Sequence, residues 1–363
     1  MSYKYPVYQP NLSGNEKKYV LECLDSTWIS SKGKFIQQFE ENFSRFSGIK
    51  NSISVSNGTV ALHVALLALG IGQDDEVIVP TFTYIASVNA IQYTGANPIF
   101  ADSDPNTWQI DVNKIEEKIT TKTKAIMAVH IYGHPCDMDA IMNIAKKYKL
   151  FIIEDCAEAI GSYYKNKHAG TMGDISTFSF FGNKAITTGE GGMVCTNDNS
   201  LADLSFRIKG QGLAKNREYY HDIVGYNYRM TNICAAIGCA QLERINEILI
   251  NKSRVAQNYI ENLNNLPIEY HKQIGNVKHS YWMFTILVSS KDERTKLRNH
   301  IKENGIETRP TFHPVHSMPM YKTKENFVVA EDLGNRGINL PSYPDLSETD
   351  IQFITGKIKE FYG

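Results

Sequence analysis

The chain has 363 residues, of which 42% are hydrophobic, so it is long enough for two domains and too apolar for intrinsic disorder. Its formal net charge of −1 gives no support for a nucleic-acid partner or an anionic membrane surface. No apolar run could span a membrane, no signal-peptide pattern opens the chain, and the six cysteines form no CxxC pair, which together are typical of a cytoplasmic protein.

The amino-terminal segment predicts two helices joined by a polar loop. Residues 14–25 have helical character, and aromatic side chains recur at helical spacing between residues 35 and 46, which predicts a core-facing stripe. The loop between them carries Trp28, Ser31 and Lys32. Such a loop could bind a ligand, although a plain surface loop is the more frequent case.

A strand at residues 51–56 is followed at once by a turn of small residues, Ser56-Asn57-Gly58-Thr59, and then by a nearly all-apolar helix at 60–69. A helix this apolar is expected to be buried. Free backbone N–H groups at its start, with a glycine that permits close approach and the Thr59 hydroxyl, would bind an anion such as a phosphate. An ordinary helix cap is the simpler alternative, and the two are compatible.

Strands and helices then alternate along the chain, which predicts an α/β fold with a mostly parallel central sheet and helices on both faces. The strands are predicted at 76–80, 98–102, 124–130, 150–154, 177–181 and 193–195, and the helices at 84–93, 111–119 and 136–148. In such sheets ligands bind at the carboxyl ends of the strands, so residues at those ends are the candidates for function.

Several polar side chains fall at these strand ends. Lys184 follows an apolar strand, where desolvation would lower its pKa as imine formation requires, although it could also be a surface lysine. Asp155 ends another apolar strand and needs a partner, either a pyridinium nitrogen or the next helix as a cap. Together with Tyr84, Ser179 and the turn at Gly58, these are the parts of one site that holds a phosphate and a pyridine ring.

Two other kinds of site are disfavoured by the sequence. His130 and His134 have HxxxH spacing, but Gly133 and Pro135 place them in a loop, and no third ligand is evident, so we expect no metal site. The chain contains neither a GxGxxG nor a GxxxxGK[ST] motif, which argues against dinucleotide and P-loop binding.

The carboxyl-terminal third predicts a smaller α+β unit. A polar loop at 210–228 precedes one long helix at 232–263. The remaining elements are strands at 281–289 and 306–310 and helices at 292–303 and 347–361. We place the domain boundary at 240, with a large α/β domain and amino-terminal arm over 1–240 and a small α+β domain over 241–363.

Motifs along nearly the whole chain resemble the vitamin-B6-dependent sugar-nucleotide aminotransferases. The phrases are SNGT at 56–59, PTFTYIAS at 80–87, IEDCAEA at 153–159, FSFFGNKAITTGEGGMV at 178–194 and GYNYRMT at 225–231. The resemblance implies an aspartate-aminotransferase-type (fold type I) enzyme that uses pyridoxal 5′-phosphate. It also implies a homodimer with shared active sites and a role in O-antigen and lipopolysaccharide synthesis.

The resemblance assigns roles to individual positions. Lys184 corresponds to the lysine that forms an imine with the cofactor and moves protons, Asp155 to the pyridinium partner, Glu158 to a residue near the ring hydroxyl, and Tyr84 to the stacking aromatic. The phosphate ligands correspond to Gly58, Thr59, Ser179 and, from the other subunit, Asn227. The positions that would meet the sugar nucleotide correspond to Trp28, Ser31, Lys32, Phe312, His313 and His316.

The finer phrases, among them YPVYQP, LDSTWISSKGKFI and FHPVHSMPMY, most resemble the branch acting on GDP-linked ketosugars. That branch implies L-glutamate as amino donor and C4 of GDP-4-keto-6-deoxymannose as acceptor. Related dehydratases have histidine at the position of Lys184, so the lysine favours transamination. Two alternatives remain, namely a dTDP- or UDP-linked ketosugar as acceptor and a non-catalytic regulator that binds the cofactor.

Overall fold

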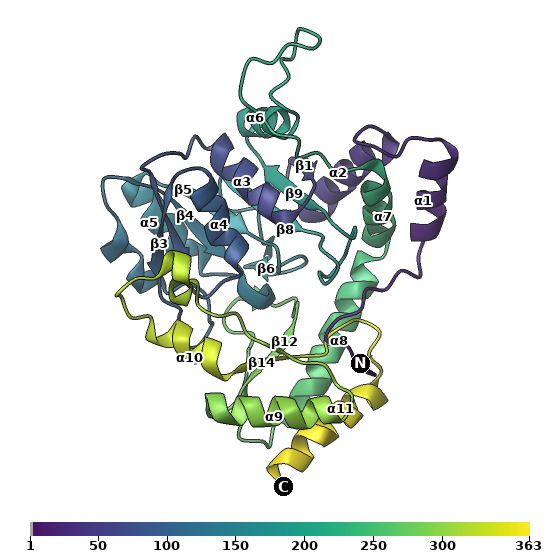
Figure 1. The fold of residues 1–363 in the computed structure, drawn as a ribbon, viewed down its shortest axis with the longest axis vertical. Helices are drawn as coiled ribbons and strands as arrows, with labels where there is room; N and C mark the ends of the chain where they lie inside the picture. The colour runs from purple at the N-terminus through teal and green to yellow at the C-terminus, as the bar shows by residue number, and fades with distance from the viewer. Residues whose placement is uncertain (1–2) are drawn as a thin grey trace.

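The computed structural model describes residues 3–363 (Figure 1). The α-helices are α1 (Glu16–Asp25), α2 (Lys34–Ser47), α3 (Gly58–Ala68), α4 (Ile85–Tyr93), α5 (Met138–Tyr148), α6 (Asn199–Lys209), α7 (Asn232–Glu243), α8 (Ile245–Leu263), α9 (Lys291–Glu303), α10 (Val328–Arg336) and α11 (Glu348–Tyr362). Across the described residues no helix is both long and apolar enough to cross a membrane.

The central sheet has seven strands. Their spatial order is β1 (Asn51–Val55), β9 (Gly192–Thr196), β8 (Ile175–Ser179), β5 (Phe151–Asp155), β4 (Thr123–Val129), β2 (Glu76–Pro80) and β3 (Asn97–Ala101). Only β9 runs antiparallel to its neighbours within this sheet. The α/β prediction with a mostly parallel sheet is therefore confirmed, and the carboxyl ends of six strands meet at one edge.

Alternate residues of each strand are buried under helices on opposite faces, as a parallel sheet requires. On β4, Met127 belongs to the core beneath α3, α4 and α6, whereas Ile126 and Ala128 belong to the core beneath α5. On β8, Phe178 packs with Phe43 from α2, at 4.9 Å between ring centres, in the part of the core that also includes α7. Both faces of the sheet are thus covered by helices.

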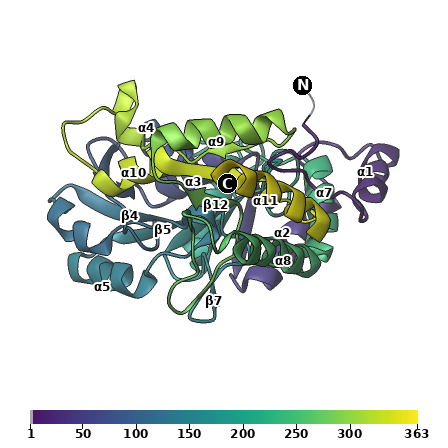
Figure 2. The ribbon, with the colours of Figure 1, turned by 90° about the horizontal axis from the view of Figure 1, so that it is seen from below.

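A second, smaller sheet forms the carboxyl-terminal part of the chain. It contains β10 (Glu269–Tyr270), β12 (Phe284–Leu287), β14 (Gly337–Leu340) and β13 (Arg309–Pro310) in that order. Helices α8, α9 and α11 cover it, with α9 and α11 side by side in Figure 2. Tyr5 of the amino-terminal arm pairs with Ile306 and joins this core. A third sheet consists of β11 (Val277–Lys278), β6 (Tyr163–Tyr164) and β7 (Lys167–His168). The division at residue 240 stays a proposal.

The structure corrects three of the predicted elements. The predicted long helix at 232–263 is two helices, because the backbone at Arg244 leaves helical geometry (φ −110°, ψ 10°). The predicted helix at 111–119 is two 3-10 turns, Val112–Lys114 and Glu116–Lys118, with Asp111 as cap. The predicted strand at 177–181 instead spans β8 and ends at Ser179, so Lys184 lies in the following turn.

Three buried histidines, His134, His271 and His279, pack together between the central sheet and the smaller carboxyl-terminal sheet. The His271 Nε2–H donates to the carbonyl of Thr107 (2.7 Å), so its Nδ1 is left to accept from His279 Nε2 (3.3 Å). His134 Nε2 accepts from the backbone N–H of Ile274 (3.3 Å). Each ring is thus satisfied as neutral imidazole, and burial lowers the pKa of all three, that of His134 to about 4.

We expect this cluster to make the protein sensitive to acid. The unfolded chain binds a proton at His134 near pH 6.5 and the folded chain binds it only near pH 4, so the stability from this residue is complete above pH 6.5 and is lost as pH falls. Between pH 7 and 5.5 the loss from His134 should be about 1 kcal/mol, and the lowered pKa values of His271 and His279 act in the same direction. Urea unfolding at both pH values should show a smaller difference for His134→Gln than for the native chain. The exposed His313→Gln is the matched control and should keep the native difference.

Candidate active site

The structure brings Asp155, Glu158 and Lys184 together at the carboxyl edge of the large sheet. Asp155 is the last residue of β5, Glu158 lies in the turn after it, and Lys184 lies in the turn after the neighbouring β8. The Lys184 ammonium nitrogen is 3.9 Å from the Glu158 carboxylate, and the side chain of Lys184 is only 11% exposed. Three ionisable groups from two adjacent strands therefore share one water-poor space.

Asp155 is held in place by two hydrogen-bond donors. The Ser87 hydroxyl donates to its Oδ2 (2.8 Å), and the backbone N–H of Ala157 donates to its Oδ1 (3.1 Å). Burial raises the pKa of Asp155 despite these bonds, because a carboxylate loses its hydration there. A cationic partner in front of Asp155 would restore the anionic form.

Lys184 and Glu158 form a buried pair in which desolvation outweighs mutual attraction. Burial lowers the pKa of Lys184 and raises the pKa of Glu158 to about 7. The backbone N–H of Tyr132 donates to Glu158 Oε2 (2.7 Å) and fixes that carboxyl group. The lowered pKa of Lys184 favours the neutral amine that a nucleophile or a general base needs.

The start of α3 and the end of β8 form an anion cradle. Asn57 caps α3 by accepting from the backbone N–H of Val60 (2.9 Å). A Cβ on Gly58 would lie 2.8 Å from the Cβ of Ser179, closer than real contacts allow. Only glycine therefore permits the helix start to approach Ser179, where N–H groups and a hydroxyl converge as phosphate ligands do. Thr59 continues this first turn, half-buried.

Aromatic rings form one wall of the site. Tyr84, the N-cap residue of α4, is 57% exposed, and its ring centre lies 5.6 Å from that of Phe312. Phe312 stacks on Tyr132 at 5.3 Å, and Tyr132 stacks on Trp282 at 5.9 Å. Sequence reasoning missed Ser87, Tyr132 and Trp282. The motif PTFTYIAS contained Ser87, but no pattern pointed to Trp282.

The other expected substrate residues lie in two different settings. The backbone carbonyl of Trp28 accepts from the Asn232 side chain (2.7 Å) at the start of α7, with Ser31 and Lys32 following in the same loop. His316 is buried, 2.7 Å from the Thr81 hydroxyl, whereas His313 is exposed. Substrate contacts by these residues stay predictions, as do the functional roles of the cofactor residues.

Asn227 is exposed in the loop between α6 and α7. Its Oδ1 accepts from both Nε (3.2 Å) and Nη2 (2.8 Å) of Arg229. Because a guanidinium group can only donate, this contact fixes which end of the Asn227 amide faces it. The amide nitrogen is left as a donor for another group, and its role toward a second subunit stays a prediction.

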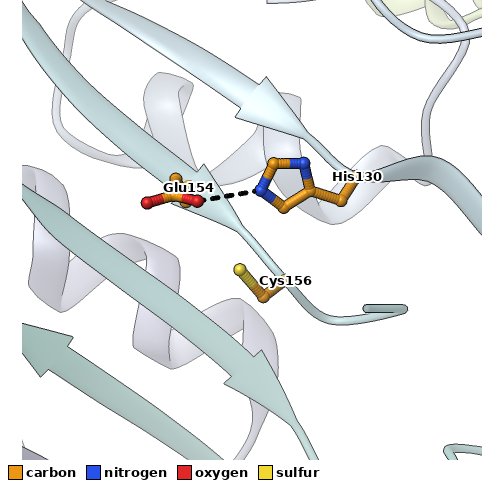
Figure 3. A group of neighbouring side chains, drawn as sticks. All are labelled: His130, Glu154 and Cys156. Atoms are coloured by element: carbon orange, nitrogen blue, oxygen red, sulfur yellow. Dashed lines mark hydrogen bonds and ion pairs between the residues drawn. The ribbon is translucent and has the colours of Figure 1, made fainter. Parts of the chain in front are cut away.

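A buried group on the opposite face of β5 contains His130, Glu154 and Cys156, whose potential ligand atoms lie within 4.8 Å of one another (Figure 3). His130 Nδ1 accepts from the backbone N–H of Cys136 (3.0 Å), so its Nε2–H donates to Glu154 (3.0 Å). The backbone N–H groups of Gly170, Met172 and Gly173 also donate to Glu154. These bonds explain the group as a support for the turn that follows β7.

The fold and the site define an α/β enzyme with a buried lysine beside two carboxyl groups and a phosphate cradle. A family model of the DegT/DnrJ/EryC1/StrS aminotransferase family matches residues 10–359. GDP-perosamine synthases of Escherichia coli O157:H7 and Vibrio cholerae are 62% and 49% identical to the chain, with 98% of the chain covered in both cases and 98% and 99% of the relatives. A sugar aminotransferase of Streptococcus pneumoniae, solved in PLP, PMP and apo forms, superposes with a TM-score of 0.93 at 26% identity for its PLP form, covering 99% of this chain and 98% of that one.

The chain belongs to the DegT/DnrJ/EryC1/StrS aminotransferase family and is an aminotransferase that depends on pyridoxal phosphate. The residues present fit this cofactor. The cradle at Gly58 and Ser179 suits its phosphate, and the buried carboxylate of Asp155 suits its ring nitrogen. Thr177 pairs with Asp155 across β5 and β8, and its buried hydroxyl has no hydrogen-bond partner in the protein. A polar group of a bound cofactor would supply that partner.

The cradle yields a test in which two glycines are exchanged for alanine. Gly58→Ala should weaken binding of pyridoxal phosphate by about tenfold or more, because the added Cβ pushes Ser179 away from the helix start. Gly356→Ala in α11, where a Cβ meets nothing within 4 Å, should leave binding unchanged. Cofactor titration followed by absorbance measures both. If Gly58→Ala bound pyridoxal phosphate with native affinity, the assignment of this cradle as the phosphate site would be wrong.

Proposed function

We propose that this aminotransferase transfers the amino group of L-glutamate to C4 of GDP-4-keto-6-deoxymannose and so makes GDP-perosamine. The observation that carries the proposal is the 62% identity to the Escherichia coli GDP-perosamine synthase over 98% of both chains. The site chemistry supports it, because a partly desolvated lysine beside a buried aspartate suits transfer of an amino group. A dTDP- or UDP-linked ketosugar is the alternative acceptor.

Pyridoxal phosphate, when bound, supplies an electrophilic carbon and a ring that withdraws electrons from the bond to be broken. Asp155 would hold the ring nitrogen protonated, and its own hydrogen bonds from Ser87 and Ala157 keep the carboxylate aimed. Gly58, Thr59 and Ser179 would bind the phosphate, and Tyr84 would cover the ring.

Lys184 would move the proton that transamination requires. Burial lowers its pKa, which favours the neutral amine that can remove a proton and then return it as an acid. Glu158, with a pKa near 7, lies 3.9 Å away and can balance the charge that Lys184 gains. One lysine thus serves both half-reactions, first with glutamate and then with the ketosugar.

The nucleotide part of the substrate would bind outside this centre. The Phe312 ring packs against Tyr84, which places the loop that contains His313 and His316 next to the proposed cofactor site. The substrate would bind along this loop. Lys32 and Ser31 offer an ammonium and a hydroxyl suited to a diphosphate or a sugar. Binding energy from these remote groups would orient the ketone carbon without taking part in the chemistry.

The active unit is proposed to be a homodimer in the cytoplasm. Asn227 supports the dimer, because Arg229 holds its Oδ1 and leaves the amide nitrogen to donate to a phosphate of the second subunit. The six cysteines are unpaired thiols, which supports a reducing compartment.

The choice of nucleotide can be tested with two substrates. With glutamate and pyridoxal phosphate, GDP-4-keto-6-deoxymannose should give an amino-sugar nucleotide detected by mass. The dTDP-linked 4-keto-6-deoxyglucose should have a kcat/KM that is lower by a factor of at least about ten, because directed contacts to the nucleotide are lost. Lys184→Ala should show no turnover and sets the background. Equal or better turnover of the dTDP substrate would overturn the GDP assignment and leave the aminotransferase assignment intact.

The shared site predicts complementation between two inactive variants. Lys184→Ala and Asn227→Trp, each inactive alone, should recover part of the native activity when co-expressed. In a mixed dimer one site carries both defects and the other carries neither. The mixed dimer is isolated with two different affinity tags, and its kcat is compared with that of each parent. A purified mixed dimer without activity would contradict a site built from both subunits.

A further inference from the structure

The indole of Trp282 lies directly against the amine of Lys184. The Lys184 ammonium nitrogen is 4.0 Å from the ring centre of Trp282, within the range of a cation–π contact. Trp282 precedes β12 in the carboxyl-terminal part of the chain and is 5% exposed, so the contact is shielded from water. Shielding strengthens an attraction between a cation and a ring face.

The indole cannot turn away from this position, because four contacts fix it. Its Nε1–H donates to the carbonyl of Asn183, the residue before Lys184 (2.7 Å). Its backbone N–H donates to Tyr132 (3.1 Å), and its backbone carbonyl accepts from the buried Lys252 ammonium (3.0 Å). Tyr132 also stacks on the ring. Trp282 is therefore held by its backbone and its side chain alike.

Charged and titratable groups meet Lys184 from several elements. The carboxyl groups of Glu158 and Asp155, which come from the end of β5 and the turn after it, attract its ammonium. The Tyr8 hydroxyl, from the amino-terminal arm, donates to the Lys184 carbonyl (2.6 Å). Lys252, on α8, lies behind Trp282, and burial lowers its pKa to about 7. The Lys184 nitrogen is thus about equally near a carboxyl group, at 3.9 Å, and the indole ring centre, at 4.0 Å.

We propose that the Lys184 amine lies against the ring face of Trp282 whenever it is not bonded to the cofactor. Trp282 would then be a positioning residue for proton transfer. The inference rests on the proposed role of Lys184. Transamination would leave Lys184 free for part of each cycle, and a flexible lysine chain then has many rotamers to visit. A fixed indole face limits those rotamers and keeps the nitrogen near the reacting carbon.

The first measurement is tryptophan emission of the full chain without cofactor, titrated from pH 6 to 10. A proton gained or lost by Lys184 changes the charge on the Trp282 face and hence its emission. We expect a transition in the native chain that is reduced in Lys184→Met and lost in Trp282→Phe, because Lys252, which donates to the Trp282 carbonyl and has a pKa of about 7, contributes the remainder in Lys184→Met. Trp108→Phe, which removes a buried tryptophan stacked on His271 instead, should keep the transition. A Lys184→Met curve that superimposes on the native curve would overturn the inference.

The second measurement is the steady-state kinetics of the loaded enzyme. Trp282→Phe keeps an aromatic face and should lower kcat about tenfold, while Trp282→Leu should lower it further, both with KM for the ketosugar little changed. Trp108→Phe should keep its kcat. Equal kcat values for Trp282→Leu and the native enzyme would reject a positioning role. The emission titration needs no sugar nucleotide, so a wrong substrate assignment leaves its result unchanged.

Discussion

The site depends on placing three ionisable side chains where little water reaches them. Asp155, Glu158 and Lys184 are all nearly buried at one edge of the large sheet, and burial of an ion costs several kcal/mol even after the structure relaxes. That cost shifts the pKa of each group toward its neutral form. The same shift favours Lys184 as a base and leaves Asp155 in need of a cationic partner. The energetic cost of burying these groups is therefore what suits them to react with a cofactor.

The fold provides the donors that make this burial tolerable. Six strands end at one edge, so short turns from distant parts of the chain aim N–H and hydroxyl groups at the same place. Ser87 comes from the start of α4, and the N–H of Tyr132 comes from the turn after β4. On the opposite face of β5 the apolar pattern is interrupted by Glu154, where His130 and backbone N–H groups satisfy the carboxylate. Neighbouring residues of one strand thus carry a structural carboxylate, Glu154, and a carboxylate, Asp155, that is proposed to act on the cofactor.

Local sequence patterns predicted the sheet well because they depend on neighbouring residues. The predicted strand at 76–80 has the same bounds in β2, and Asp155 lies at the end of β5, whereas Lys184 lies in the turn after β8. The break at Arg244 was missed because neither glycine nor proline marks the sequence between α7 and α8. The role of Trp282 could not be predicted, since it meets Lys184 across a separation of almost a hundred residues, and a lone tryptophan before a strand most often belongs to a core.

The Lys184 turn also bears on how the two proposed domains work together. Its backbone carbonyls at Asn183 and Lys184 accept from Trp282 in the carboxyl-terminal part and from Tyr8 in the amino-terminal arm. Neither contact comes from the sheet that supplies the lysine. A change in the position of the small sheet relative to the large one would therefore move the reactive amine directly. The proposed boundary at 240 would divide the chain into two domains, but contacts from both sides of it hold the turn that contains Lys184.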